Sequence, residues 1–230
     1  MALSIDSVEQ LAWAGSDATP TNLTVTAPTS CSQAIVFWEY WNGSDNGDLV
    51  SCTLDGNGID QGSTFSVGTE SNAGAVGFNS PASGSMTLAI EFGGIPAGGD
   101  GPVGFIVWLV DSATTWEANQ AACDAGGGDA NFTFTGIASG QLVLVMQVGY
   151  AATPAVLGGI FSQESFFINQ DHHARLSSGT AAGTSVALTN NASQPAIVAV
   201  SVSEDIATGG STPKGPLGHP FFGPFSGPIS

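Results

Sequence analysis

The most chemically suggestive residues of this chain stand between positions 171 and 175. The sequence Asp171-His172-His173-Ala174-Arg175 holds two of the three histidines and the only arginine. Imidazole and carboxylate groups could bind a metal ion or transfer protons. If the segment is a strand, however, His172 and His173 point to opposite faces and cannot both bind one ion. Gln170 or Asp171 could join one of them, and the alternative is a polar turn between two strands.

Two acidic segments carry the oxygen chemistry that calcium prefers. They read Asp45-x-x-Asp48 and Asp55-x-Asn57-x-x-Asp60. Neither completes an EF-hand loop, which requires a glutamate at its twelfth position. We interpret both as solvated turns, and Asp55-Gly56 and Asn57-Gly58 as suited to tight hairpin turns.

The motifs of several large enzyme classes are missing. The chain has no Gly-x-Ser-x-Gly nucleophile elbow, no phosphate-binding P-loop and no His-Glu-x-x-His zinc motif. We therefore predict a protein that is not an enzyme, with no catalytic residues, no metal and no cofactor. A hydrolase with two carboxylates brought together on a sandwich fold is a further alternative.

Charge excludes whole classes of partner. Asp and Glu number 19 and Lys and Arg only 2, so the net charge is −17. Nucleic-acid binding depends on many cationic contacts with phosphate, and only Arg175 and Lys214 could make them. We predict no nucleic-acid partner and no membrane partner. The amino-terminal residues also lack the cationic and apolar regions of a secretory signal.

The cysteines and the tryptophans each allow two interpretations. Cys31, Cys52 and Cys123 match no zinc spacing, so we expect buried thiols, with one disulfide and one leftover thiol as the alternative. Trp38, Tyr40 and Trp41 crowd one segment. Tryptophan can stack on sugars, but within an apolar strand it more often belongs to a core.

The last sixteen residues have a period of four. Each proline there is followed by an apolar residue, at Leu217, Phe221, Phe225 and Ile229. Proline and glycine prevent a helix or a central strand, so we predict an extended arm with four apolar anchors. Burying the anchors would gain about 6–12 kcal/mol, whereas ordering the arm would cost roughly 1 kcal/mol per residue. The arm would therefore act as a tether beside a docked domain rather than as an independent ligand.

Alternation of apolar and polar residues dominates the rest of the chain. Residues 86–92 and 132–135 show it clearly, and residues 142–146 and 198–202 place apolar side chains on one face. Residues 33–41 and 103–110 are apolar on both faces, which indicates central strands covered on both sides.

The one modest helix candidate is residues 114–125, which could equally be a loop covering a sheet.

These patterns predict an all-β fold, an antiparallel β-sandwich or jelly-roll-like domain with an extended Gly/Pro-rich C-terminal arm. No Gly/Ser linker divides residues 1–206, so we predict one β-sandwich domain there and the arm over residues 207–230.

The chain resembles virion structural proteins of tailed bacteriophages, of the capsid decoration (cement) or fibre type. The resemblance is carried by Met1 without a signal, by a Gly/Ser/Thr/Ala-rich β chain with few cations and by the Gly-Pro arm. Two segments add to it, Ser30-Cys31-Ser32-Gln33-Ala34-Ile35-Val36-Phe37 and Gln141-Leu142-Val143-Leu144-Val145. The resemblance implies jelly-roll or immunoglobulin-like modules on the outer capsid.

We therefore expect a non-enzymatic virion protein, made in the host cytoplasm, that decorates or stabilises the outer capsid surface. Its partners would be the major capsid protein or another virion protein and further copies of itself. The alternative is a carbohydrate-binding or adhesin module, as in tail or head fibres, that binds a glycan through exposed aromatics and acidic loops.

Overall fold

The computed structural model describes residues 3–13, 21–41, 49–63, 71–93, 102–110, 114–123, 129–169, 171–193 and 195–204. These residues form fifteen strands, β1 to β15, and every strand pair among them is antiparallel. The predicted all-β class is confirmed. No helix long and apolar enough to cross a membrane occurs in this described part of the chain.

The first eight strands make a roll of two sheets. The inner sheet has the order β1-β8-β3-β6-β5, and the outer sheet has the order β2-β7-β4. The bounds are β1 (Ser4–Ala12), β2 (Thr21–Ala27), β3 (Cys31–Trp41), β4 (Leu49–Leu54), β5 (Gln61–Ser63), β6 (Ser71–Asn79), β7 (Gly84–Phe92) and β8 (Val103–Val110). This is the strand order of an eight-stranded jelly roll, except that β5 pairs with β6 and not with β4.

The last seven strands make a second roll. Its inner sheet has the order β12-β13-β11-β15-β9, and its outer sheet contains only β10 and β14. The bounds are β9 (Thr114–Cys123), β10 (Ala130–Thr135), β11 (Leu142–Tyr150), β12 (Phe161–Asn169), β13 (His172–Thr180), β14 (Ser185–Asn190) and β15 (Ala196–Glu204).

The two rolls repeat one topology. If β9 is matched to β1, the second inner sheet repeats the order of the first inner sheet strand for strand. The outer sheets differ, because the position held by β4 in the first roll has no strand in the second. Residues 151–160 occupy that place in the chain order, and they contain no strand.

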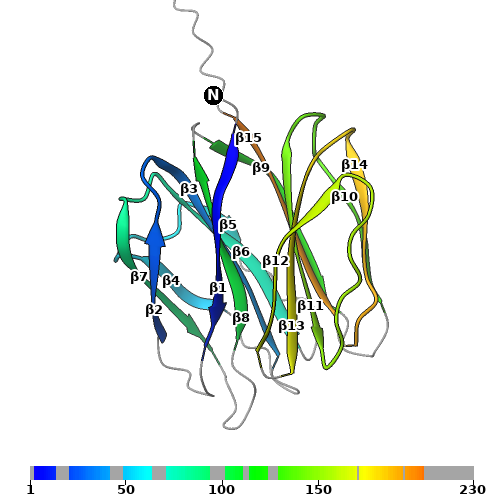
Figure 1. Cartoon of the computed structure of the whole chain (residues 1–230), viewed down its shortest axis with the longest axis horizontal. Coiled ribbons are helices and arrows are strands. Elements are labelled where there is room, and N and C mark those ends of the chain that lie inside the picture. Colours follow the sequence, from blue (N-terminus) through cyan, green and yellow to red (C-terminus); the bar gives the residue numbers. More distant parts are fainter. Residues whose placement is uncertain are drawn as a thin grey trace, which may run out of the picture.

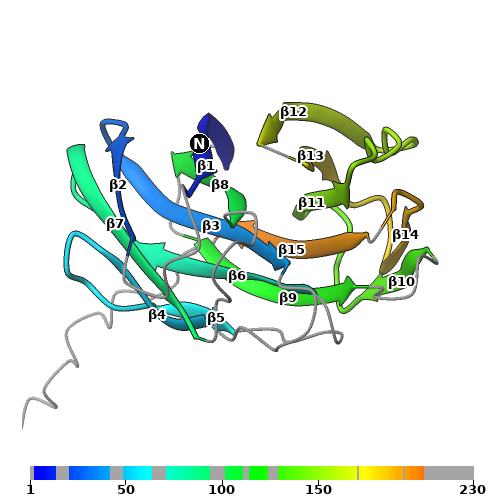
Figure 2. The same ribbon diagram turned by 90° about the horizontal axis from the view of Figure 1, so that it is seen from below.

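The four sheets stack as layers, with the two inner sheets facing each other in the middle (Figure 1; Figure 2). Three apolar clusters fill the gaps between them. One lies inside the first roll, one lies between the rolls and one lies inside the second roll. The central cluster combines side chains such as Phe37 and Phe105 from the first roll with Met146 and Val198 from the second.

Stacking explains the strands that are apolar on both faces. In β3, Trp38 faces the outer sheet and Phe37 faces the second roll, and both are fully buried. The predicted covering of both faces of β3 and β8 is confirmed. For β11 and β15 the sequence suggested one apolar face, yet Val143 and Ile197 on the other face are also buried, beneath the second outer sheet.

The helix suggested for residues 114–125 is wrong. Residues 114–123 form strand β9, which pairs along its length with β15. Alanine, glutamate and glutamine favour helices only weakly, by a few tenths of a kcal/mol each. Pairing with a buried neighbour strand outweighs that preference.

Several predictions fall outside the residues that the structure describes. They are the arm with Leu217, Phe221, Phe225 and Ile229, the boundary at residue 207 and the acidic segment with Asp45 and Asp48. These stay predictions.

Candidate functional site

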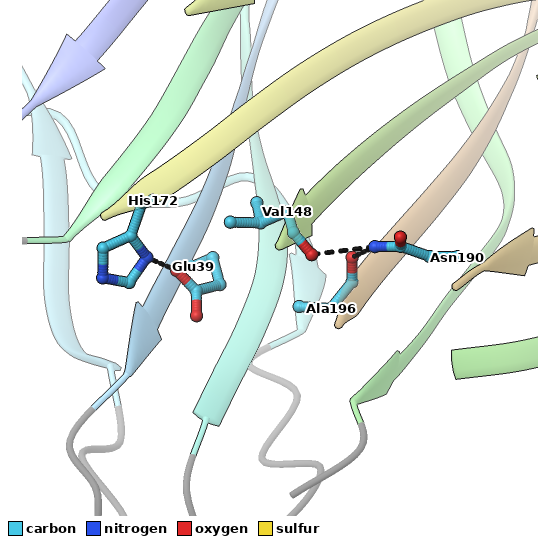
Figure 3. Close-up of polar contacts among 5 residues, drawn as sticks. All are labelled: Glu39, Val148, His172, Asn190 and Ala196. Atoms are coloured by element: carbon cyan, nitrogen blue, oxygen red, sulfur yellow. Dashed lines mark hydrogen bonds and ion pairs between the residues drawn. The ribbon is translucent and has the colours of Figure 1, made fainter. Parts of the chain in front are cut away.

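A buried acid–histidine pair joins the two rolls. His172 Nδ1 lies 3.0 Å from Glu39 Oε2, and the two side chains are 1% and 3% exposed. Figure 3 shows His172 at the start of β13 and Glu39 near the end of β3, on the facing inner sheet. Each side chain continues the row that builds the central cluster, Glu39 after Phe37 and His172 before Ala174.

The histidine is flanked by residues of its own roll. Tyr150, at the end of β11, stands opposite His172 in the sheet register, and its ring packs edge-on at 5.7 Å. The Tyr150 hydroxyl donates to Asp171 Oδ2 at 3.2 Å. His172 therefore has Glu39 of the facing sheet on one side and Tyr150 on the other, and Tyr150 in turn contacts Asp171.

The second histidine points the other way. His173 Nδ1 lies 2.8 Å from Thr153 Oγ1, on the face of β13 that turns away from the first roll. The prediction that His172 and His173 lie on opposite faces is thus confirmed. No cluster of three potential metal ligands occurs among the described residues.

The buried pair is suited to orientation. Neither side chain offers surface to a substrate, since both are almost completely enclosed. Removing one partner leaves the other polar group buried and unpaired, which typically costs about 1–3 kcal/mol. Sliding one roll over the other would have a similar effect, so the pair favours one alignment of the rolls.

A network of amides makes a second connection. The backbone N–H of Trp116 in β9 donates to Gln61 Oε1 at 3.0 Å, and its indole N–H donates to Gln33 Oε1 at 3.1 Å. Gln33 and Gln61 both donate to Asn79 Oδ1, at 3.0 and 3.1 Å. The indole fits because Gly77 has no side chain; a Cβ there would lie 2.9 Å from Trp116 Cζ2.

Asn190 fastens the outer sheet of the second roll. Its side-chain amide donates to the carbonyls of Val148 and Ala196, at 2.8 and 2.9 Å, as Figure 3 shows. Its Oδ1 accepts from the Ala192 N–H at 3.2 Å. One fully buried side chain at the end of β14 thus holds both β11 and β15. Its sequence context, Asn-Asn-Ala-Ser, resembles an ordinary turn, so no signal indicated this role.

The only arginine lies inside the second roll. Arg175 is 7% exposed, and its Cζ stands 5.1 Å from the centre of the Phe166 ring. Burial lowers the pKa of its guanidinium below the ordinary value. The sequence suggested Arg175 as part of a polar cluster with the histidines, but His172 lies on the opposite face of the strand.

The described acidic segment forms turns. Asp55 and Gly56 have φ values of 51° and 80°, and Leu54 and Asn57 exchange backbone hydrogen bonds at 3.0 Å, as in a type I′ turn. Asp60 Oδ2 accepts from the Asn79 N–H at 2.7 Å. A surface hollow of about 370 Å³ lies alongside, lined by Leu54, Asn57, Gly58, Asp60, Asn79, Ser80, Pro81 and Ala82.

The aromatic and thiol predictions have clear outcomes. Trp38 and Tyr40 are 0% and 1% exposed, so both belong to the core. Cys31 and Cys52 are buried thiols, as predicted, whereas Cys123 is only half-buried, and none of the three forms a disulfide. Burial raises the pKa of Cys31 to about 11 and that of Cys52 to about 12.

The fold defines an all-β protein made of two stacked jelly-roll-like sandwiches. Comparison of the chain with protein-family models, with curated proteins and with solved structures gave no match.

Proposed function

We propose that this protein is a non-enzymatic structural component of a virus particle. It decorates or stabilises the outer capsid surface, and its C-terminal arm contacts neighbouring subunits. The observation that carries the proposal is a jelly-roll-like strand order, which both rolls follow apart from the position of β5 and the strand that the second roll lacks. Jelly rolls are a common architecture of capsid proteins. The support is thus an analogy at the level of the fold, since one fold serves many functions.

Two further features are compatible with this role. The rolls are joined by an apolar core, a buried acid–histidine pair and an amide network, which suits a rigid building block. The net charge of −17 suits a surface that faces away from packaged nucleic acid.

The carbohydrate-binding alternative receives less support from the aromatic residues. It required exposed aromatic rings, whereas Trp38 and Tyr40 are enclosed. The large apolar side chains that are exposed in the described part of the chain are Val50, Ile59, Val156 and Ile168, all of them aliphatic.

The test is the presence of the protein on particles. Particles of the virus that encodes this chain would be purified and labelled with a gold-conjugated antibody raised against the recombinant protein. We expect surface labelling and co-sedimentation of added protein with unlabelled particles. Particles that neither contain nor bind the protein would overturn the proposal.

A matched variant tests the arm. Replacement of Leu217, Phe221, Phe225 and Ile229 by Ser removes the anchors and keeps the length and the prolines of the arm. We expect an unchanged β circular-dichroism spectrum and weaker co-sedimentation. Co-sedimentation equal to that of the unmodified chain would reject the contact role of the arm.

A glycan array run with the unmodified protein and with the four-fold Ser variant would reveal the carbohydrate-binding alternative.

A further inference from the structure

Arg175 lies on the outer face of the second inner sheet, which turns away from the first roll. In the register it stands between Gln147 of β11 and Phe166 of β12. Its strand neighbours Ala174 and Leu176 point the other way, into the central cluster. The side chain therefore lies on the face of the sheet that belongs to the second roll.

This guanidinium has an aromatic neighbour but no acceptor. No hydrogen bond or ion pair joins Arg175 to another residue that the structure describes, and its Nε is completely enclosed. An arginine side chain cannot lose its proton in a protein, so it remains charged. An enclosed Nε–H without an acceptor is unfavourable, and the contact with Phe166 compensates it only in part. The two terminal nitrogens of the guanidinium are not among the enclosed unpaired atoms.

The carboxylates closest to β13 already have partners. Glu164 on β12 accepts hydrogen bonds from Ser162 and Ser178. Asp171 accepts from Tyr150, and Glu39 pairs with His172 across the rolls. The chain has 19 acidic residues and a single arginine. No described acidic residue forms an ion pair with that arginine.

Two more unsatisfied polar atoms share this face. Ser177 Oγ and Gln147 Oε1 are enclosed and have no hydrogen-bond partner in the described structure. Ser177 follows Arg175 by two residues on the same side of the strand, and Gln147 lies directly opposite Arg175. Buried polar groups in native proteins are nearly always hydrogen-bonded, and the register places these three on neighbouring positions of one sheet face.

The cover over these groups is the part of the second roll that lacks a strand. The outer strands β10 and β14 pack mainly on β9, β11 and β15. Over β13, residues 151–160 contact the strand at His173, through Thr153, and at Gly179, against the Ile160 carbonyl. Arg175 and Ser177 lie between these two positions on the strand.

We propose that Arg175 and the Ser177 hydroxyl form a binding site for a small oxyanion of the phosphate or carboxylate class, entered between β13 and residues 151–160. The guanidinium presents a planar fork of donors that matches the oxygens of either group. Gln147 Oε1 adds an acceptor for the O–H group of hydrogen phosphate. Acetate has no such O–H group. Phosphate therefore binds more tightly than acetate. The site does not depend on the proposed virion role.

Because Arg175 is the only arginine, its guanidinium can be observed without ambiguity. In 15N-labelled protein the Nε–Hε group gives a single arginine signal. We expect that signal to shift and saturate on addition of sodium phosphate at constant ionic strength, with a dissociation constant on the order of 1 mM. A saturable shift with sodium acetate alone would assign the site to carboxylates. A shift that grows linearly with both anions would overturn the proposal.

A matched variant provides an independent readout. Arg175→Met keeps the length and apolar stem of the side chain and removes the charge. Phosphate should raise the thermal midpoint of the unmodified protein more than that of Arg175→Met, because only the former binds it. Equal increases in the two proteins would overturn the proposal. If Arg175→Met does not fold, the titration of the unmodified protein decides alone.

Ser177→Ala tests the second donor. We expect it to fold, since a small side chain replaces another, and to weaken phosphate binding several-fold in the Arg175 titration. An unchanged dissociation constant would remove Ser177 from the site.

Discussion

The two rolls share one strand order but have different interiors. In the first roll, Trp13, Trp38 and Tyr40 surround Phe92, with ring centres 6.1, 5.4 and 5.7 Å from it. In the described part of the second roll, the buried cluster holds one fully enclosed ring, Phe134, among smaller apolar residues, together with buried Gln147 and Asn190. The first roll is filled by aromatic packing, whereas the second combines apolar packing with hydrogen bonds.

The difference follows the cover that each inner sheet receives. Three outer strands shield the first inner sheet, so large side chains can be buried there without loss of backbone hydrogen bonds. Two outer strands shield the second, and Asn190 supplies donors where regular pairing ends. A missing strand thus turns part of a core into a place where polar groups accumulate, among them Arg175.

The largest effect should come from emptying the aromatic core. Trp38→Ala should lower the free energy of unfolding by about 3–5 kcal/mol, because a fully buried ring leaves a cavity. Urea unfolding measures the loss. Trp38→Phe is the control, since it keeps a ring and removes an indole N–H that has no partner, and it should cost about half as much or less. A loss below about 1 kcal/mol for Trp38→Ala would show that the first roll does not depend on aromatic packing.

A smaller effect should come from forcing the rolls apart at Trp116. Gly77→Ala places a Cβ 2.9 Å from Trp116 Cζ2, and such overpacking costs about 1–3 kcal/mol. Gly58→Ala is the matched control, because nothing lies within 4 Å of its new Cβ and its effect should stay within about 0.5 kcal/mol. Urea unfolding of both variants measures the difference.

A double mutant locates the origin of that cost. In a Trp116→Ala background, Gly77→Ala should cost little, since the clashing ring is gone. If the penalty at Gly77 persists without the tryptophan, the indole is not the contact that joins the rolls there.

The smallest effect should appear at alkaline pH in the first roll. Burial raises the pKa of Cys52 from 9.0 to about 12, so the unfolded chain ionises first. The contribution of the buried, neutral thiol to the free energy of unfolding is fully present below pH 9.0 and falls as the pH rises toward 12. By pH 10 the loss should be about 1 kcal/mol for this thiol. Urea unfolding of the unmodified protein and Cys52→Ala at pH 7 and pH 10 tests this: identical pH dependence in both would rule out Cys52.

Local patterns predicted much of the first roll. Apolar residues on both faces indicated β3 and β8 as central strands. Asp55-Gly56 indicated a tight turn. Both signals can be read from residues that are close together in the sequence. Alternation also placed His172 and His173 on opposite faces. Strand β9 was missed, because its pairing with β15 brings together residues about 80 positions apart in sequence.

The sequence by itself determined the all-β class, the strands with two apolar faces, the extreme acidity and the divergence of the two histidines, since periodicity and composition express these directly. Only the tertiary structure decided that two rolls repeat one order, that Glu39 meets His172 and that Arg175 is buried without a carboxylate among the described residues. Those features arise where strands distant in sequence meet, and no local pattern specifies which faces will meet.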